Sequence, residues 1–109
     1  MKIVFDAMPD TVLEKFCGGE KELRAKMFID ENGKILRGTL APGASIGLHT
    51  HGTSSEMFYY LSGCGKVICD GKEERVFAGD CHYCPKGSAH TMINDGAEDL
   101  VFFAVVPLQ

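Results

Sequence analysis

The sequence predicts an all-β fold, a sandwich or barrel, with one short helix near the N-terminus. Short runs rich in β-branched and aromatic residues recur along the chain at regular spacing. Turn-forming residues separate these runs, for example at 30–33, 42–43 and 70–71. With 109 residues, 45% of them hydrophobic and 24% charged, the chain suits a single globular domain. We therefore expect one domain over residues 1–109, with the barrel core at about 23–106.

The helix is predicted over residues 11–17. Asp10 can cap its first turn, and its apolar side chains recur on one face until Gly18 and Gly19 end it. The strands that follow are predicted from short apolar or alternating runs bounded by turn residues. They lie at residues 23–29, 35–40, 45–51, 56–61, 65–69, 73–77, 82–84, 89–93 and 100–106.

Three of the four histidines and one glutamate form a candidate metal site. His49 and His51 are two residues apart, so both imidazoles point to the same face of an extended strand. Glu56 begins the next predicted strand after the turn at 52–55, and His90 must come from elsewhere in the fold. Imidazole nitrogens with one carboxylate suit divalent iron, manganese, nickel, copper or zinc. The sequence thus predicts one divalent transition metal ion without choosing among these.

Each of these four residues alone has a plainer explanation. A single histidine is more often hydrogen-bonded or exposed than metal-bound, and a single glutamate is most often solvated. Three imidazoles and a carboxylate that converge in an apolar barrel need a partner, and a divalent cation satisfies them. His82 lies outside the ligand pattern, so a structural or surface role is expected for it before a catalytic one.

Two spaced motifs resemble the signatures of the cupins. The first is Gly43-x5-His49-x-His51-x4-Glu56-x6-Gly63, and the second is Gly79-x5-Pro85-x-Gly87-x2-His90-x3-Asn94. The resemblance implies a double-stranded β-helix, or jelly-roll barrel, with the four candidate ligands at the metal. It does not fix the chemistry, because cupins include dioxygenases, isomerases, decarboxylases, lyases, sugar-binding modules and storage proteins.

The predicted ligand set favours an enzyme over the other classes. Four protein ligands leave positions open at an octahedral metal for water, oxygen or a chelating substrate. We expect a metal-dependent dioxygenase, lyase or isomerase that acts on a small acidic, keto or sugar-derived substrate. The alternative is a module of the same fold that binds a sugar or other small molecule without turnover. A storage protein is disfavoured because it has no need of four converging ligands.

Strand alternation suggests a pocket wall but no assured acid or base. Counting by two from Glu56 places Phe58 and Tyr60 on its face, and counting from His90 places Met92 and Asn94 beside that ligand. These four side chains can equally be barrel core. Tyr60 is a weak candidate proton donor. An acidic substrate would need a cation in the pocket. The candidates on the early strands are Arg24, Lys26 and Arg37, but we expect each of them to lie on the solvated surface.

Composition disfavours several partners. The chain has a net charge of −4 and no run of lysines or arginines, which disfavours nucleic-acid binding. No stretch reaches the ~18 apolar residues that a membrane span needs.

The five cysteines do not form the disulfide pattern of a secreted protein. We therefore expect reduced thiols and a cytoplasmic location, with Cys81 and Cys84 as buried structural residues. By resemblance, we expect a homodimer in which residues 3–5 and 23–29 cover or extend a sheet edge.

Overall fold

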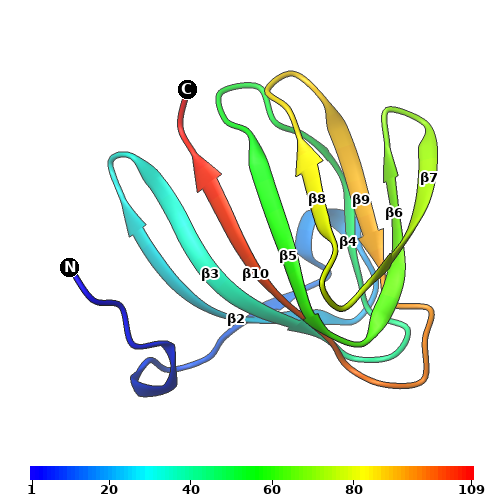
Figure 1. Ribbon diagram of the computed structural model, residues 1–109, viewed down its shortest axis with the longest axis horizontal. Coiled ribbons are helices and arrows are strands. Elements are labelled where there is room, and N and C mark those ends of the chain that lie inside the picture. The colour runs from blue at the N-terminus through cyan, green and yellow to red at the C-terminus, as the bar shows by residue number, and fades with distance from the viewer.

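Two antiparallel sheets face each other in the computed structural model, which describes all 109 residues (Figure 1). The larger sheet has six strands in the order β1-β2-β3-β10-β5-β8, and the smaller has four in the order β4-β9-β6-β7. Neighbours in each sheet are mostly distant in sequence, so the chain crosses repeatedly between the sheets. This arrangement confirms the predicted jelly roll.

All nine predicted strands are present, with ends shifted by at most two residues. The six-stranded sheet contains β1 (Thr11–Glu14), β2 (Glu22–Asp30), β3 (Gly33–Leu40), β10 (Leu100–Pro107), β5 (Glu56–Ser62) and β8 (Cys81–Cys84). The four-stranded sheet contains β4 (Ser45–Thr50), β9 (Ala89–Ile93), β6 (Cys64–Cys69) and β7 (Lys72–Phe77).

The predicted helix over residues 11–17 is wrong. Thr11–Glu14 instead forms strand β1, which pairs with β2, and only the 3-10 turns η1 (Phe5–Ala7) and η2 (Phe16–Gly18) are helical. Lys15 and Cys17 both have positive φ angles, which interrupt any regular helix here. The apolar spacing fits a helix, but the edge of β2 offers this segment a strand partner. Tertiary pairing therefore overrides the local pattern.

The core lies between the inner faces of the two sheets. Alternate residues of β10 point inward, so Leu100, Phe102, Ala104 and Val106 are buried while their neighbours are less so. The same alternation buries Leu36 and Leu40 of β3. Removal of these apolar side chains from water is the main favourable contribution to folding.

The N-terminal segment packs tightly against β4. The backbone N–H of Glu20 donates to Ser45 Oγ over 2.8 Å, and the N–H of Ser45 donates back to the Glu20 carbonyl over 3.0 Å. Gly47 lies so close to this segment that a Cβ atom there would stand 2.0 Å from the Cys17 carbonyl oxygen. Glycine is therefore required at position 47 for the segment to dock.

Gly47→Ala should destabilise the protein by about 1–3 kcal/mol, because the added methyl forces the docked segment away from β4. The midpoint of thermal unfolding should then fall by roughly 5–15 °C for a domain of this size. Gly52→Ala is the matched control, since a Cβ at Gly52 would meet nothing within 4 Å. Equal unfolding midpoints for the two variants would contradict the close approach at Gly47.

The five cysteines are all free thiols. Cys84 is buried as predicted, and burial raises its pKa to about 12. Cys81 is exposed, which corrects the expectation that both are buried. Three residues apart on β8, the two side chains point to opposite faces of the strand.

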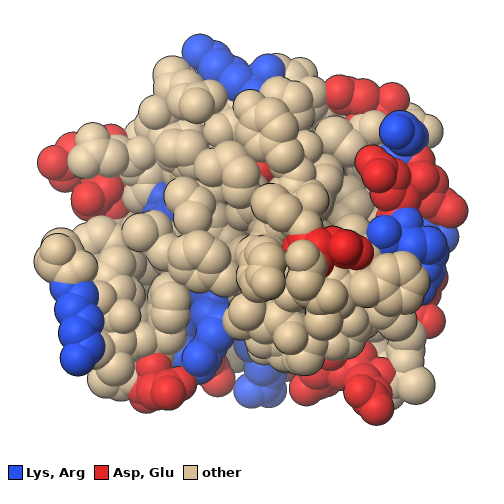
Figure 2. Space-filling model, viewed as in Figure 1, with Lys and Arg blue, Asp and Glu red and all other residues tan.

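The surface is mixed in charge, and no helix of the chain has the length and apolar character to cross a lipid bilayer. On the face shown in Figure 2, acidic and basic side chains alternate around the periphery, and the centre is largely uncharged.

Candidate metal centre

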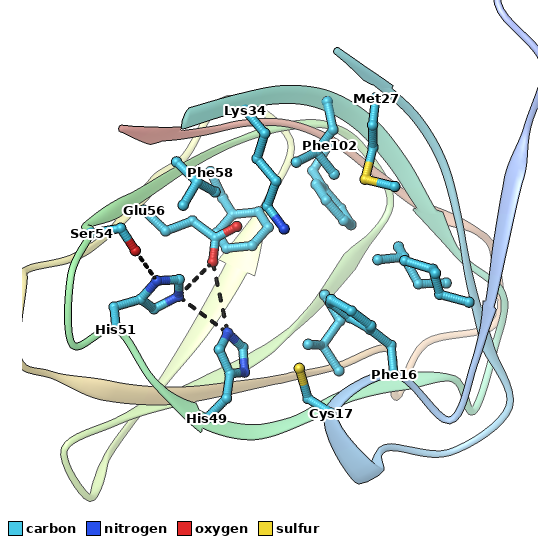
Figure 3. A pocket seen from close by; sticks show the side chains of 15 residues that line it. Phe16, Cys17, Met27, Lys34, His49, His51, Ser54, Glu56, Phe58 and Phe102 are labelled. Carbon is cyan, nitrogen blue, oxygen red and sulfur yellow. Dashed lines mark hydrogen bonds and ion pairs between the residues drawn. The ribbon is translucent and has the colours of Figure 1, made fainter. Parts of the chain in front are cut away.

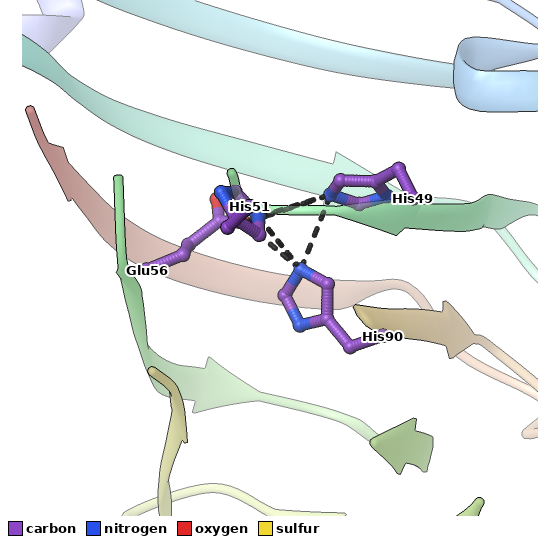
Figure 4. Close-up of side chains that lie close together, drawn as sticks. All are labelled: His49, His51, Glu56 and His90. Carbon is purple, nitrogen blue, oxygen red and sulfur yellow. Dashed lines mark hydrogen bonds and ion pairs between the residues drawn. The ribbon is translucent and has the colours of Figure 1, made fainter. Parts of the chain in front are cut away.

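Four side chains converge at one end of the space between the sheets (Figure 4). His49 comes from β4, His51 follows that strand, Glu56 begins β5 and His90 lies on β9. One donor atom from each lies within 4.8 Å of the others. His90 is 2% exposed and Glu56 is 6% exposed, whereas His49 is only half-buried. The structure therefore brings together all four residues predicted as ligands.

Strand pairing explains how the sequence assembles this cluster. β4 and β9 are antiparallel, and His49 lies directly opposite His90. The register shifts between Ile46 and His49, which turns the end of β4 toward the cluster. The loop before β9 fixes His51, because its carbonyl accepts from the N–H of Gly87 and its N–H donates to the Ser88 carbonyl. The loop that leads into the His90 strand thus also holds His51.

Hydrogen bonds outside the cluster orient the three imidazoles. The Gly47 carbonyl lies 2.8 Å from His49 Nδ1 and can only accept, so this nitrogen carries the proton. His51 Nδ1 lies 2.9 Å from Ser54 Oγ, and His90 Nδ1 lies 2.9 Å from His82 Nε2. When Nδ1 of each ring carries its proton, the three Nε2 atoms can bind a metal ion. An arrangement of this kind is typical of metal-bound histidines.

The distances between donor atoms test whether a metal ion fits. The three Nε2 atoms are 3.1, 3.1 and 3.2 Å apart. Glu56 Oε1 lies 2.9 Å from His51 Nε2, 3.1 Å from His90 Nε2 and 3.9 Å from His49 Nε2. For metal–ligand bonds of about 2.1 Å, neighbouring corners of an octahedron are ~3.0 Å apart and opposite corners ~4.2 Å, whereas all tetrahedral corners are ~3.4 Å apart.

Five short distances and one long one match four corners of an octahedron. His49 and Glu56 would hold an octahedral ion from roughly opposite sides, and His51 and His90 would hold it from neighbouring ones. The two positions left over at such an ion would be adjacent. The donor set therefore fits a divalent ion and leaves room for a ligand with two donor atoms.

Glu56 is ionised in this environment. Burial opposes its charge, but hydrogen bonds with the histidines outweigh burial and hold the pKa of Glu56 well below its usual range. The carboxylate of Glu56 is therefore negatively charged at neutral pH, and its hydrogen bond with His49 raises the pKa of that imidazole. A divalent cation that binds the cluster would take the place of the proton in this hydrogen bond.

His82 is a supporting residue that sequence reasoning placed in a structural or surface role. Its Nε2 lies 2.9 Å from His90 Nδ1, and its ring stacks on that of Phe58 with 6.1 Å between the ring centres. Burial, with a contribution from nearby His90, lowers the pKa of His82 to about 4, so it is neutral and able to accept at pH 7. No spacing rule from the ligand motif identifies this contact, because β8 and β9 belong to different sheets.

A cavity of about 250 Å³ opens beside the cluster (Figure 3). Its polar end carries His49, His51, Ser54 and Glu56. The rest of its lining is mainly apolar and consists of Leu13, Phe16, Cys17, Leu23, Met27, Lys34, Leu36, Ile46, Phe58, Phe102 and Val106. The N-terminal segment, which sequence reasoning did not connect with the site, supplies one wall.

Of the predicted pocket residues, Phe58 lines this cavity. Tyr60, Met92 and Asn94 point inward as alternation predicts, but they lie in the core away from the cavity lining. The Tyr60 hydroxyl lies 3.8 Å from the Met92 sulfur, and burial raises its pKa. The Asn94 amide donates to the carbonyls of Leu40 and Glu98. Tyr60 is therefore poorly placed to give a proton to a ligand in this cavity.

The cation in the cavity is Lys34, which sequence reasoning did not single out. The three cations that it did consider pair elsewhere, Arg24 with Glu22, Lys26 with Asp10 and Arg37 with Asp6. Strand alternation gives the missing signal, because Lys34 is two residues before the buried Leu36 and so shares its inward face.

A family model described as "Cupin domain" matches residues 36–106, about two thirds of the chain. The chain is a cupin. The matched range contains all four clustered residues, so the resemblance seen in the two motifs is confirmed. The N-terminal wall of the cavity lies before this range.

Several relatives of this cupin are named for oxalate. The oxalate-binding protein of Thermotoga maritima is 40% identical over 74 residues, which are 68% of this chain and 61% of that protein. Oxalate decarboxylase OxdC of Bacillus subtilis is 38% identical over 72 residues, 62% of this chain but 19% of that protein. The chain thus spans about three fifths of the length of the first relative and about one fifth of the length of the second.

Among solved structures, a predicted oxalate decarboxylase of Thermotoga maritima superposes over 100% of both chains. Its TM-score is 0.94 at 29% sequence identity. The KdgF protein of a Halomonas species covers 100% of this chain and 94% of its own with a TM-score of 0.80, but at 16% identity it shares the fold alone.

Proposed function

We propose that this cupin binds one divalent transition metal ion through His49, His51, Glu56 and His90, and holds a small carboxylic acid at that ion. The observation that carries the proposal is the set of donor distances, which would leave two adjacent positions free at an octahedral ion. A carboxylate with a second oxygen on the neighbouring carbon, as in oxalate or a 2-oxo acid, can fill two such corners. The oxalate-related names of its relatives support the same substrate class.

We further propose that the bound acid is turned over, as a lyase or dioxygenase would do. A divalent metal supplies Lewis-acid polarisation of the bound oxygens and, for redox-active metals, a site for oxygen. The chain's own residues then orient the acid. Lys34 provides a positive charge in the cavity, and the apolar walls exclude water and so strengthen its attraction to a carboxylate.

Binding without turnover is the second candidate, and the composition of the cavity favours it. Besides the clustered residues, the only ionisable side chains in the lining are Lys34 and Cys17. The lining contains no carboxylate or histidine outside the metal cluster that could act as a general acid or base. A sensor or carrier of a small acid would need no such group.

Metal analysis and reaction assays separate these candidates. Protein purified without added metal, and after reconstitution, should hold about one divalent ion per chain, whereas His49→Ala should hold much less. Oxalate and 2-oxo acids should bind only to the metal-loaded protein in a calorimetric titration. Release of carbon dioxide or uptake of oxygen then establishes an enzyme, and saturable binding without either establishes a binding protein. Absence of site-dependent metal after reconstitution would refute the whole proposal.

His82 should support metal binding through His90. Replacing His82 with Phe keeps an aromatic ring against Phe58 but removes the acceptor for the His90 proton, so metal affinity should fall about 10–100-fold. His82→Gln retains a carbonyl acceptor and should recover part of the loss. Competition with a chromophoric chelator measures both affinities. Equal affinities for the Phe and Gln variants would show that His82 serves packing alone.

We also propose a homodimer formed through the outer face of the six-stranded sheet. Tyr59, Leu61 and Tyr83 are large side chains about half exposed on β5 and β8, and the paired strand β10 adds Phe103 beside Tyr59. Residues 22–25 of β2, which include part of one expected contact segment, are already paired with β1. Sedimentation should show a species of about twice 11.9 kDa at micromolar concentration, and Tyr83→Glu should dissociate it. A wild-type monomer would refute this interface.

A further inference from the structure

The cavity beside the metal cluster is divided between a polar end and an apolar body. His49, His51, Ser54 and Glu56 form the polar end. The apolar body is formed by aliphatic and aromatic side chains from both sheets and from the N-terminal segment, among them Leu13, Met27, Leu36, Ile46 and Phe102. A ligand that fills the cavity must therefore present chemically different ends.

Lys34 is a cation without a partner in this apolar surrounding. Lys26 and Lys66 form ion pairs and Lys21 donates to a carbonyl, but Lys34 has neither an ion pair nor a hydrogen bond in the structure. Its Nζ lies 5.8 Å from the centre of the Phe16 ring, and Figure 3 shows the ammonium group directed into the cavity. A partly buried charge is unfavourable unless paired, so this position favours an anionic ligand group.

The volume of the cavity is large for oxalate. About 250 Å³ equals roughly eight molecules of liquid water at ~30 Å³ each. Oxalate has six non-hydrogen atoms, all of them polar or bonded to two oxygens, so it offers no apolar surface to the walls. Cavity walls of this kind gain affinity by taking apolar area out of water, at about 25 cal/mol per Å². A doubly charged ligand would instead lose hydration against them.

From these observations we infer that the ligand is a small monocarboxylic acid with an apolar body, such as a 2-oxo acid of about four to six carbon atoms. Its acid end lies between Lys34 and the metal cluster, and its aliphatic chain packs against Met27, Leu36 and Phe102. Lys34 selects for the negative charge, and the apolar lining selects for the chain. This inference rests on the proposed function, since the acid end shares the metal site.

Calorimetric titration of the Mn²⁺-loaded protein under nitrogen tests the ligand class. The titrants are oxalate and the straight-chain 2-oxo acids of increasing length, beginning with pyruvate. Affinity should rise about fourfold with each added methylene until the cavity is full, and the best 2-oxo acid should bind more tightly than oxalate. Methyl esters of the same acids, which lack the charge, should bind weakly.

Lys34→Met tests the cation, because methionine keeps an unbranched side chain but removes the charge. It should weaken binding of every 2-oxo acid by about 10–100-fold while manganese content and the unfolding midpoint stay near the wild-type values. Lys72→Met makes the same change of charge at an exposed position of β7 and should leave binding unchanged. Lys34→Gln also removes the charge and should weaken binding of the same acids.

The outcomes distinguish the two levels of the proposal. If oxalate binds in a metal-dependent way but longer acids bind more weakly, or if Lys34→Met and Lys34→Gln bind like the wild type, the inference is overturned and the proposed function stands. If no carboxylic acid binds in a metal-dependent way, the proposed function fails and this inference fails with it.

Discussion

Thermal unfolding of this cupin should occur on the order of 15 °C higher with a bound divalent ion than after chelation. A ligand that binds only the folded state at a thousand times its dissociation constant adds about 4 kcal/mol to the free energy of unfolding. For a domain of about 100 residues, each kcal/mol shifts the midpoint by roughly 4 °C or more. The gain has a specific source, because donor atoms of three imidazoles and one carboxylate lie within 4.8 Å of one another, where one cation can bind all four.

His90→Ala should abolish this metal-dependent increase. His90 Nε2 lies within 3.2 Å of a donor atom of each of the other three residues, so its loss removes the contact common to all of them. Differential scanning calorimetry with and without chelator measures the change. Thr50→Ala, at an exposed position of β4, is the control that should keep the full metal effect. A midpoint that responds to metal equally in both variants would show that the ion binds elsewhere.

Phe102→Ala should destabilise the fold by about 3–5 kcal/mol, the largest loss expected from one core substitution. Phe102 is 0% exposed, its ring meets that of Phe58 edge-to-face at 4.9 Å, and it packs onto the backbone of Gly38. Urea unfolding followed by fluorescence or circular dichroism measures the change. Metal content of the folded protein should stay near the wild-type value, because Phe102 supplies no donor to the cluster.

Phe77→Ala is the matched control for this prediction. Phe77 is about half exposed at the end of β7, so its removal should change the free energy of unfolding by less than about 1 kcal/mol. Similar losses in the two variants would mean that Phe102 does not stabilise the core in the way its burial indicates. The Phe102 variant also enlarges the cavity, so a bulkier acid should bind to it better than to the wild type.

Much of this fold was predictable because two local signals agree along most of the chain. Turn residues bound each strand, and alternation marks which face is buried, as at Leu100, Phe102 and Ala104 of β10. The metal cluster was predictable for a related reason. His49 and His51 are two residues apart, and the two motifs contain Glu56, which begins β5, and His90, which lies opposite His49 on β9.

The errors arise where a partner distant in sequence decides the structure. Residues 11–14 could satisfy their backbone within a helix, but the edge of β2 offers them a strand partner, and this choice is invisible locally. Tyr60 faces inward as predicted, but its position along the barrel axis places its hydroxyl against the Met92 sulfur and not in the cavity. Lys34 was missed because it precedes the strand predicted over residues 35–40, whereas β3 begins at Gly33 and alternation with Leu36 places Lys34 on the inner face.

The docking of the N-terminal segment has an evolutionary consequence. The clustered histidines and glutamate lie between residues 49 and 90, whereas Phe16, Cys17, Met27 and Lys34 of the cavity wall precede the range that the family model matches. Substitutions in this early segment can therefore reshape the ligand pocket while the metal site is inherited unchanged. Homologues that share both motifs can diverge in what they recognise through the first 35 residues alone, so comparison of that segment is the informative guide when sorting them by ligand.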